Sequence, residues 1–126
     1  MSYANIPHLR SNASSAAMDA LPAAALSAGA GTTGVTVSNT GTDERGQVVI
    51  HTGSSSVATG AQVVLTFASP YGNLAPEAVI VSPNDAATAL LNPYASATAT
   101  ALTIGVGTIP TASTTYTYNY VVVGGA

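Results

Sequence analysis

From residue 32 to the C-terminus, short runs of apolar and β-branched residues alternate with clusters of Gly, Pro, Ser and Asn. The runs recur about every 8 to 12 residues, which is typical of the strands and turns of a sandwich or barrel. No amphipathic stretch of helical length interrupts the series, so an α/β fold is disfavoured. We predict an all-β fold, an antiparallel β-sandwich that is jelly-roll-like, with an extended or short-helical N-terminal arm.

Alternation is clearest in residues 114–124, where Tyr116, Tyr118, Tyr120 and Val122 share one face of the predicted strand. The segments 94–100 and 101–107 are either two strands or one long bent strand. Asn84 and Asp85 are good caps for a short helical turn within residues 84–92. The remaining strands are expected over residues 33–39, 47–52, 61–68 and 77–83, with a turn over residues 41–46.

The N-terminal region differs in composition. Residues 11–31 are rich in Ala, Ser and Gly, and the strong helix propensity of Ala favours short helices over residues 14–21 and 23–30, separated by Pro22. Such pieces have little to bury by themselves. The region is therefore a flexible tail or an arm that orders on a partner, and we predict an attachment arm over residues 1–35 and a sandwich over residues 36–126.

The small number of charged residues disfavours binding to nucleic acids and to anionic membranes. Only 6% of residues are charged, the net charge is −3, and Arg10 and Arg45 are the only strong cations because the chain has no Lys. A nucleic-acid binder needs several cations against phosphate, and an anionic membrane needs a basic stretch. We therefore predict that neither nucleic acid nor membrane is a partner.

About two dozen of the apolar residues, which make up 47% of the chain, are Ala, with one Phe and no Trp, so a single domain buries little area per residue. Small domains compensate with disulfides, metals or subunits. Cys is absent, and two distant His make a metal site unfavourable. A surface with few charged residues is also suited to burial against a partner. We expect an oligomer or a component of a larger assembly.

Candidate chemistry is sparse. His51 sits within a predicted strand, His8 is remote from it, and no Gly-x-Ser-x-Gly elbow accompanies either. Asp43 and Glu44 are adjacent in a predicted turn, where we expect both to be solvated. No calcium or phosphate loop is present. We predict that the protein is not an enzyme and has no cofactor and no metal.

The tyrosine alternation indicates a packed stripe, either in the core or at a subunit interface, while a sugar-binding strip is the lesser alternative. Arg45 follows two acids in the same turn. It forms either a local salt bridge, which contributes little, or a pair between subunits. We assign Arg45, Tyr116, Tyr118 and Tyr120 to a predicted subunit interface.

Several motifs after residue 42 together resemble a module of tailed-phage structural proteins. The motifs are Asp43-x-Arg45-Gly46-x-Val48, Thr52-Gly53, Val63-x-Leu65-x-Phe67-x-x-Pro70-Tyr71, Ala75-Pro76-x-x-Val79-x-Val81-x-Pro83 and Thr115-Tyr116-x-Tyr118-Asn119-Tyr120-x-Val122-Val123-Gly124. They are similar to the C-terminal domain of head decoration (cement) proteins, head fibres and some tail-fibre tips, particularly in phages of actinobacteria. The resemblance covers about two thirds of the chain.

The resemblance implies a trimeric β-sandwich on the outer surface of the virion, attached through its other segment. No long Gly-x-x stalk is present, which favours a capsid decoration protein over a fibre. The implied partners are two further copies and the phage major capsid protein. We predict that Tyr3, Ile6, Leu9 and Arg10 bind the capsid. The alternative is a receptor- or glycan-binding fibre tip, with Tyr71, Tyr94 or loop residues in an exposed groove.

Overall fold

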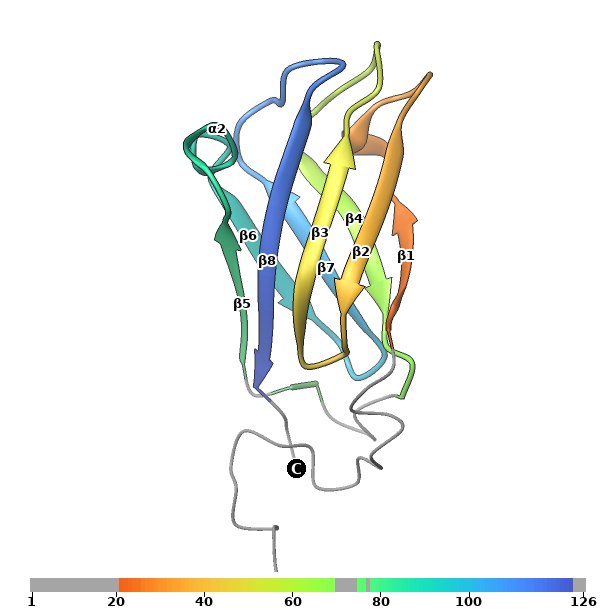
Figure 1. Ribbon diagram of the computed structural model, residues 1–126, viewed down its shortest axis with the longest axis vertical. Coiled ribbons are helices and arrows are strands. Elements are labelled where there is room, and N and C mark those ends of the chain that lie inside the picture. The colour runs from red at the N-terminus through yellow and green to blue at the C-terminus, as the bar shows by residue number, and fades with distance from the viewer. Residues whose placement is uncertain (1–20, 70–74, 77, 124–126) are drawn as a thin grey trace, which may run out of the picture.

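The computed structural model describes residues 21–69, 75–76 and 78–123. These residues form two four-stranded antiparallel sheets that pack face to face (Figure 1), which confirms the predicted all-β sandwich. The strands are β1 (Ala23–Leu26), β2 (Thr36–Gly41), β3 (Arg45–His51), β4 (Gly60–Thr66), β5 (Ala78–Pro83), β6 (Pro93–Ala97), β7 (Ala101–Val106) and β8 (Thr115–Val123). Two short helical elements join them, η1 (Ala28–Ala30) and α2 (Ala86–Ala89).

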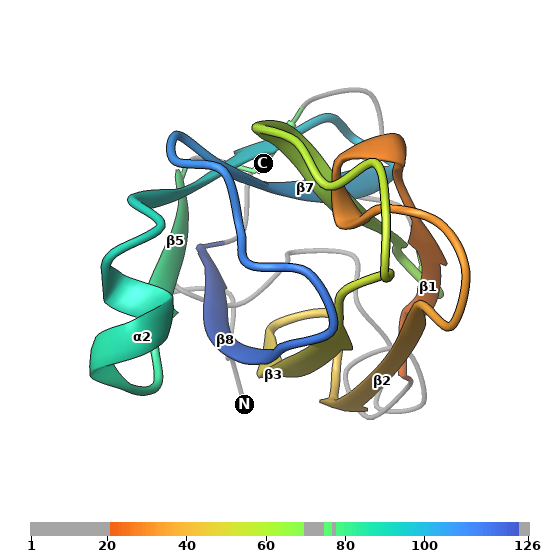
Figure 2. The ribbon, with the colours of Figure 1, turned by 90° about the horizontal axis from the view of Figure 1, so that it is seen from above.

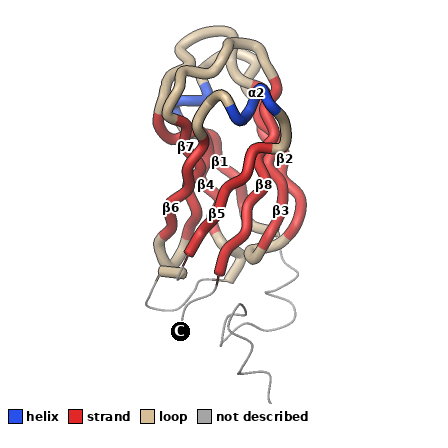
Figure 3. The backbone as a smooth tube through the Cα atoms, turned by 90° about the vertical axis from the view of Figure 1, so that its left-hand side faces the viewer, coloured by secondary structure: helices blue, strands red, loops and turns tan. Residues whose placement is uncertain are grey.

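One sheet has the order β1-β4-β7-β6 and the other the order β2-β3-β8-β5. Strand β1 contacts β2 along one side of the sandwich and β5 contacts β6 along the other, so the edge strands of the two sheets meet on both sides (Figures 2 and 3). Only β2–β3 and β6–β7 are hairpins within one sheet. Every other connection crosses between sheets, and the last strand, β8, is central in its sheet.

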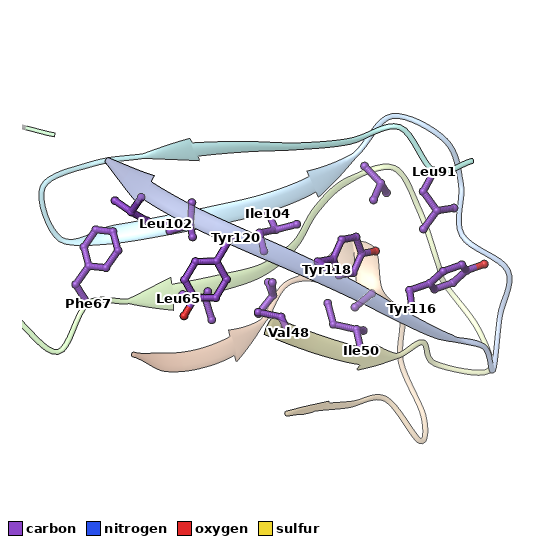
Figure 4. Packing of buried hydrophobic residues seen from close by; sticks show 14 residues of the cluster. Val48, Ile50, Leu65, Phe67, Leu91, Leu102, Ile104, Tyr116, Tyr118 and Tyr120 are labelled. Atoms are coloured by element: carbon purple, nitrogen blue, oxygen red, sulfur yellow. The ribbon is translucent and has the colours of Figure 1, made fainter. Parts of the chain in front are cut away.

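The core lies between the sheets and consists of the inward positions of the alternating strands (Figure 4). Within the predicted strand 61–68, the alternating residues Val63, Leu65 and Phe67 are all buried, but Gln62 is buried as well, at a shift in the pairing register between Ala61 and Val63. Ala contributes little to this cluster, whose volume comes from branched aliphatic and aromatic side chains. Its largest fully buried side chains are Tyr118, Tyr120, Ile50, Leu65, Leu102 and Ile104.

The predicted helix over residues 23–30 is wrong. Residues 23–26 form β1, which pairs with β4 from Ala23 opposite Thr66 to Leu26 opposite Val63, and a 3-10 turn follows. Helix propensity is a weak preference that pairing and burial override, and Ala30 is fully buried in the core. Among the described residues the sandwich therefore begins at β1, within the range 1–35 that was predicted as an arm. The predicted helix over 14–21 lies outside the described residues.

Two other expectations are settled by the hydrogen bonds. The helical turn within 84–92 is confirmed as α2, where Asp85 is the N-cap and its Oδ1 accepts a hydrogen bond from Thr88 N at 2.8 Å. The segments 94–100 and 101–107 supply two strands, because β6 and β7 form an antiparallel hairpin.

The sandwich has two distinct ends. The start of β1 and the end of β8 lie at the same end as the β2–β3 and β6–β7 turns (Figure 1). We call this the terminal end. The opposite end, the distal end, holds α2 and the β1–β2, β3–β4 and β7–β8 connections. The described chain therefore begins at the end of the sandwich farthest from these connections.

Candidate functional site

The tyrosine stripe is part of the core. Tyr116, Tyr118 and Tyr120 are 4%, 1% and 2% exposed within a single chain, and they point between the sheets (Figure 4). Tyr120 Oη donates to the Thr42 carbonyl at 2.6 Å, and Tyr116 Oη accepts from Thr111 N at 2.9 Å. Side chains buried by their own chain cannot cover another subunit. The assignment of these tyrosines to a subunit interface is therefore wrong, and the core alternative holds.

The environment of two of these hydroxyls favours the neutral form. Burial raises the pKa of Tyr118 well above its ordinary value, and the neighbouring Tyr116 adds to the effect. Burial also raises the pKa of Tyr120, with a further contribution from the Asp43 carboxylate. Both phenols stay protonated at physiological pH, so they act as packing and hydrogen-bonding groups.

Asp43 was expected to be solvated in its turn, and this is wrong. The residue is fully buried, with Oδ1 accepting from Ala68 N at 2.9 Å and Oδ2 from Ser69 N at 3.0 Å. The β2–β3 turn folds back beneath the end of β4, so that the carboxylate meets two backbone amides. Hydrogen bonds to a charged acceptor are among the stronger ones in proteins. Asp43 therefore fastens one sheet to the other.

In the same Asp43-x-Arg45-Gly46 motif, Gly46 is tightly packed and Arg45 is exposed. A Cβ on Gly46 would clash with the Thr40 carbonyl oxygen and lie 2.6 Å from the Tyr120 hydroxyl, so only glycine fits. Arg45 begins β3 and is exposed at the terminal end. The motif thus supplies two structural residues and one cation that remains accessible.

Thr52 and Gly53, another part of the phage-protein resemblance, are also structural. Thr52 is 1% exposed, and its hydroxyl donates to the Thr111 carbonyl at 2.6 Å and accepts from Thr114 N at 3.0 Å. It ties the end of β3 to the connection before β8. Gly53 packs directly against the Thr32 backbone, where a Cβ would clash.

Reactive side chains are not clustered in the part of the chain that the structure describes. His51 Nδ1 lies 3.0 Å from Thr115 Oγ1 on the outer face of a sheet. Within residues 21–69, 75–76 and 78–123, no three His, Asp or Glu side chains come together in a way that could hold a metal ion. Over the same residues, no helix has the length and apolar character to cross a membrane.

The outer side of the β1-β4-β7-β6 sheet carries no charged side chain. Inward residues of these strands pack on the core, which leaves the intervening positions facing out. The Tyr94 ring lies over Gly105 and is 48% exposed. We call this surface the uncharged face. Its residues are Ala23, Ala25, Val64, Thr66, Tyr94, Ser96, Ala101 and Thr103.

The opposite sheet has a shallow hollow of about 600 Å³ on its outer side, near the terminal end. Arg45 lies at this hollow, and its polar lining includes an amide ladder in which Gln47 Nε2 donates to Asn119 Oδ1 at 3.1 Å. Asn119 Nδ2 in turn donates to Asn84 Oδ1 at 3.3 Å. This site could not be recognised in the sequence, because Gln47 and Asn119 are brought together only by the β3–β8 pairing. Their outward position in two alternating strands was the available signal.

Charged residues are confined to the ends of the described sandwich. Glu44 and Arg45 are at the terminal end, and Asp85 is at the distal end. The capsid-binding residues predicted from the sequence, Tyr3, Ile6, Leu9 and Arg10, lie outside the described residues, as does Tyr71.

Comparisons with protein-family models, curated proteins and solved structures find no match to this chain. The likeness to phage structural proteins therefore rests on the motif residues alone. Four described residues of those motifs, Asp43, Gly46, Thr52 and Gly53, hold turns of the sandwich in place.

Proposed function

We propose that this chain is a structural, non-catalytic virion protein that decorates and stabilises a bacteriophage capsid. It forms a homotrimer and attaches to the major capsid protein through its N-terminal segment. The observation that carries the proposal is the uncharged face, eight outward positions without one charge. Water-exposed surfaces are normally rich in charge, whereas the centres of interfaces are depleted of it.

The positions of the chain ends support the proposed orientation. The N-terminal segment joins the sandwich at the terminal end, opposite α2 and the distal loops. A chain that grips a shell through this segment presents its distal end outward, on the virion surface. A protein that binds only the assembled shell stabilises that shell by mass action, without any chemistry of its own.

The subunit contact of the proposed trimer is the uncharged face, because the tyrosine stripe is occupied inside each chain. Thr103 lies at its centre, between Val64 on β4 and Ser96 on β6. Replacing Thr103 with Glu places a charge in the contact and is expected to weaken self-association at least about tenfold, equivalent to 1.4 kcal/mol. Sedimentation velocity over a concentration series measures the change.

The matched control is Ser38→Glu, which adds the same charge at an exposed position on β2 in the other sheet. It is expected to leave self-association unchanged. Equal loss in the two variants, or no loss with Thr103→Glu, would contradict the assignment of the uncharged face.

Attachment is tested on shells of the phage that encodes the chain, stripped of the native protein. Replacing Tyr3, Ile6, Leu9 and Arg10 together with Ala is expected to lower shell occupancy by about tenfold or more, since they include the only Arg of residues 1–10 and three of its large apolar or aromatic side chains. Co-sedimentation followed by protein quantification gives the occupancy. The control is the melting temperature of the free variant, which should not change. Full shell occupancy by the variant would contradict the assignment of these four residues to capsid binding.

A fibre tip is the second candidate, and the distal end favours it. Leu90 and Ile109 are the two most exposed large apolar residues described, at 74% and 62%. Both lie at the distal end beside Asn92, whose Nδ2 donates to Thr108 Oγ1 at 3.0 Å. Such a surface suits recognition of a host ligand. Binding to host cell-wall glycans that Leu90→Asp abolishes would favour this candidate, and a blank glycan array would exclude it.

A further inference from the structure

Gln62 on β4 carries a carboxamide inside the sandwich, and only one of its two polar atoms has a protein partner. The side chain is fully buried. Its Nε2 donates to the Ala58 carbonyl at 3.0 Å and to the Gly60 carbonyl at 3.1 Å. Its Oε1 is the single buried side-chain polar atom without a hydrogen-bond partner among the described residues. Buried acceptors are almost always bonded to protein or to ordered water, so this oxygen requires a donor that the described residues do not supply.

The orientation of the carboxamide is fixed by its neighbours. With the amide reversed, Oε1 would face the carbonyl oxygens of Ala58 and Gly60, and none of these three oxygens carries a hydrogen to donate. The backbone closes the same side, because a Cβ on Gly29 would clash with Gln62 Nε2. The amide nitrogen therefore belongs on this side, and the oxygen points away from the two carbonyls.

A break in the pairing of β4 with β7 lies at the same residue. Ala61 is opposite Gly105 and Val63 is opposite Ile104, so Gln62 is an extra residue without a register partner on β7. A bulge leaves its extra residue out of the regular hydrogen-bond ladder. A buried water makes about three hydrogen bonds to polar groups that the protein leaves unsatisfied. The bulge is the place nearest to Gln62 where the backbone offers such groups.

We propose that Gln62 binds one internal water molecule, which donates a hydrogen bond to Oε1 at the β4 bulge. A metal cation is a poorer occupant, because it needs several oxygen ligands and Nε2 already occupies the carbonyls of Ala58 and Gly60. An anion would face an acceptor oxygen. Water donates without bringing a charge into the interior, where an unpaired charge is unfavourable.

The water site lies at the base of the β3–β4 connection. This connection contacts the β1–β2 connection through Ala58 N, which donates to the Gly29 carbonyl at 3.0 Å. Gln62 holds the carbonyl of the same Ala58. The hydrated carboxamide thus fixes the position of this part of the distal end relative to the sheet.

A crystal structure of the full chain at a resolution that shows ordered water tests the site directly. We expect a water oxygen about 2.7 to 3.2 Å from Gln62 Oε1, in every copy of the chain. An Oε1 that accepts from a protein donor, or that has no ordered water beside it, would overturn the proposal.

A variant tests the site in solution. Gln62→Met keeps a side chain of similar length and removes the acceptor. Magnetic relaxation dispersion of water oxygen counts long-lived internal waters, and this variant is expected to lose one. The matched control is Gln47→Met, the same change at a half-buried position in the other sheet, which should lose none. Equal counts in the native chain and Gln62→Met, or equal losses in the two variants, would overturn the proposal.

Amide hydrogen exchange measures the effect on the β3–β4 connection. The Ala58 N–H is expected to exchange at least about tenfold faster in Gln62→Met than in the native chain, and at the native rate in Gln47→Met. An unchanged rate in Gln62→Met would contradict the anchoring role. If Gln62→Met does not fold, the crystal structure of the native chain still decides whether the water is bound. The outcome does not depend on the proposed capsid role.

Discussion

Replacing Tyr118 with Ala is expected to lower the free energy of unfolding by about 4 kcal/mol, since deletion of a buried aromatic side chain costs lost burial and leaves a cavity. Tyr118 is 1% exposed and is the largest fully buried side chain in the described sandwich. Urea unfolding at one fixed protein concentration measures the change, because the apparent stability of an oligomer depends on concentration.

The control for this variant is Thr117→Ala on the same strand. Thr117 faces outward. Its bond to the Thr88 hydroxyl, at 3.2 Å, comes from the backbone N–H, which the substitution keeps. Its truncation is expected to change the free energy of unfolding by less than about 1 kcal/mol. A Tyr118→Ala protein that melts like the native chain but loses self-association would contradict the core assignment and restore the interface interpretation.

Replacing Asp43 with Ala is expected to lower the free energy of unfolding by about 3 kcal/mol. The substitution removes the carboxylate that accepts two part-buried hydrogen bonds, from Ala68 N and Ser69 N, and a hydrogen bond to a charged group contributes about 1.5 to 3 kcal/mol. Asp43→Asn should lose about half as much, because its amide oxygen accepts one of the two bonds. Thermal and urea unfolding measure both variants.

Arg45→Gln is the control for Asp43, because it changes the neighbouring exposed residue of the same motif. Its effect on unfolding is expected to stay within about 0.5 kcal/mol. If Arg45→Gln lowered the free energy of unfolding as much as Asp43→Ala, the stabilising effect of the motif would come from the charges on the turn. If Asp43→Ala were neutral, the carboxylate clamp between β2–β3 and β4 would be wrong.

The strands could be predicted wherever a local signal identifies them. Period-2 alternation identified the strands within residues 61–68 and 114–124 and grouped Val63, Leu65 and Phe67 on one face and the three tyrosines on another, although Gln62 is buried as well. Strand β1 was missed because its Ala-rich sequence favours a helix locally, and only its pairing with β4 decides otherwise. The strand order was also beyond the sequence, since most neighbours in these sheets are remote along the chain.

The candidate sites show the same division. Alternation indicated that Tyr116, Tyr118 and Tyr120 pack against something, but it does not say whether that surface belongs to the same chain. Asp43 was misplaced because turn residues are usually solvated, and its partners follow β4, far along the chain. Composition showed that charge is scarce, whereas the absence of charge from one whole face needed the register of four strands.

The central claim is that the charge-poor surface of this sandwich is an assembly surface, covered first by other copies of the chain. The mass of the purified full chain in solution, measured by light scattering over a concentration range, tests it most directly. We expect a mass of three times the 12.3 kDa of one chain. A mass of 12.3 kDa at every concentration would contradict the account.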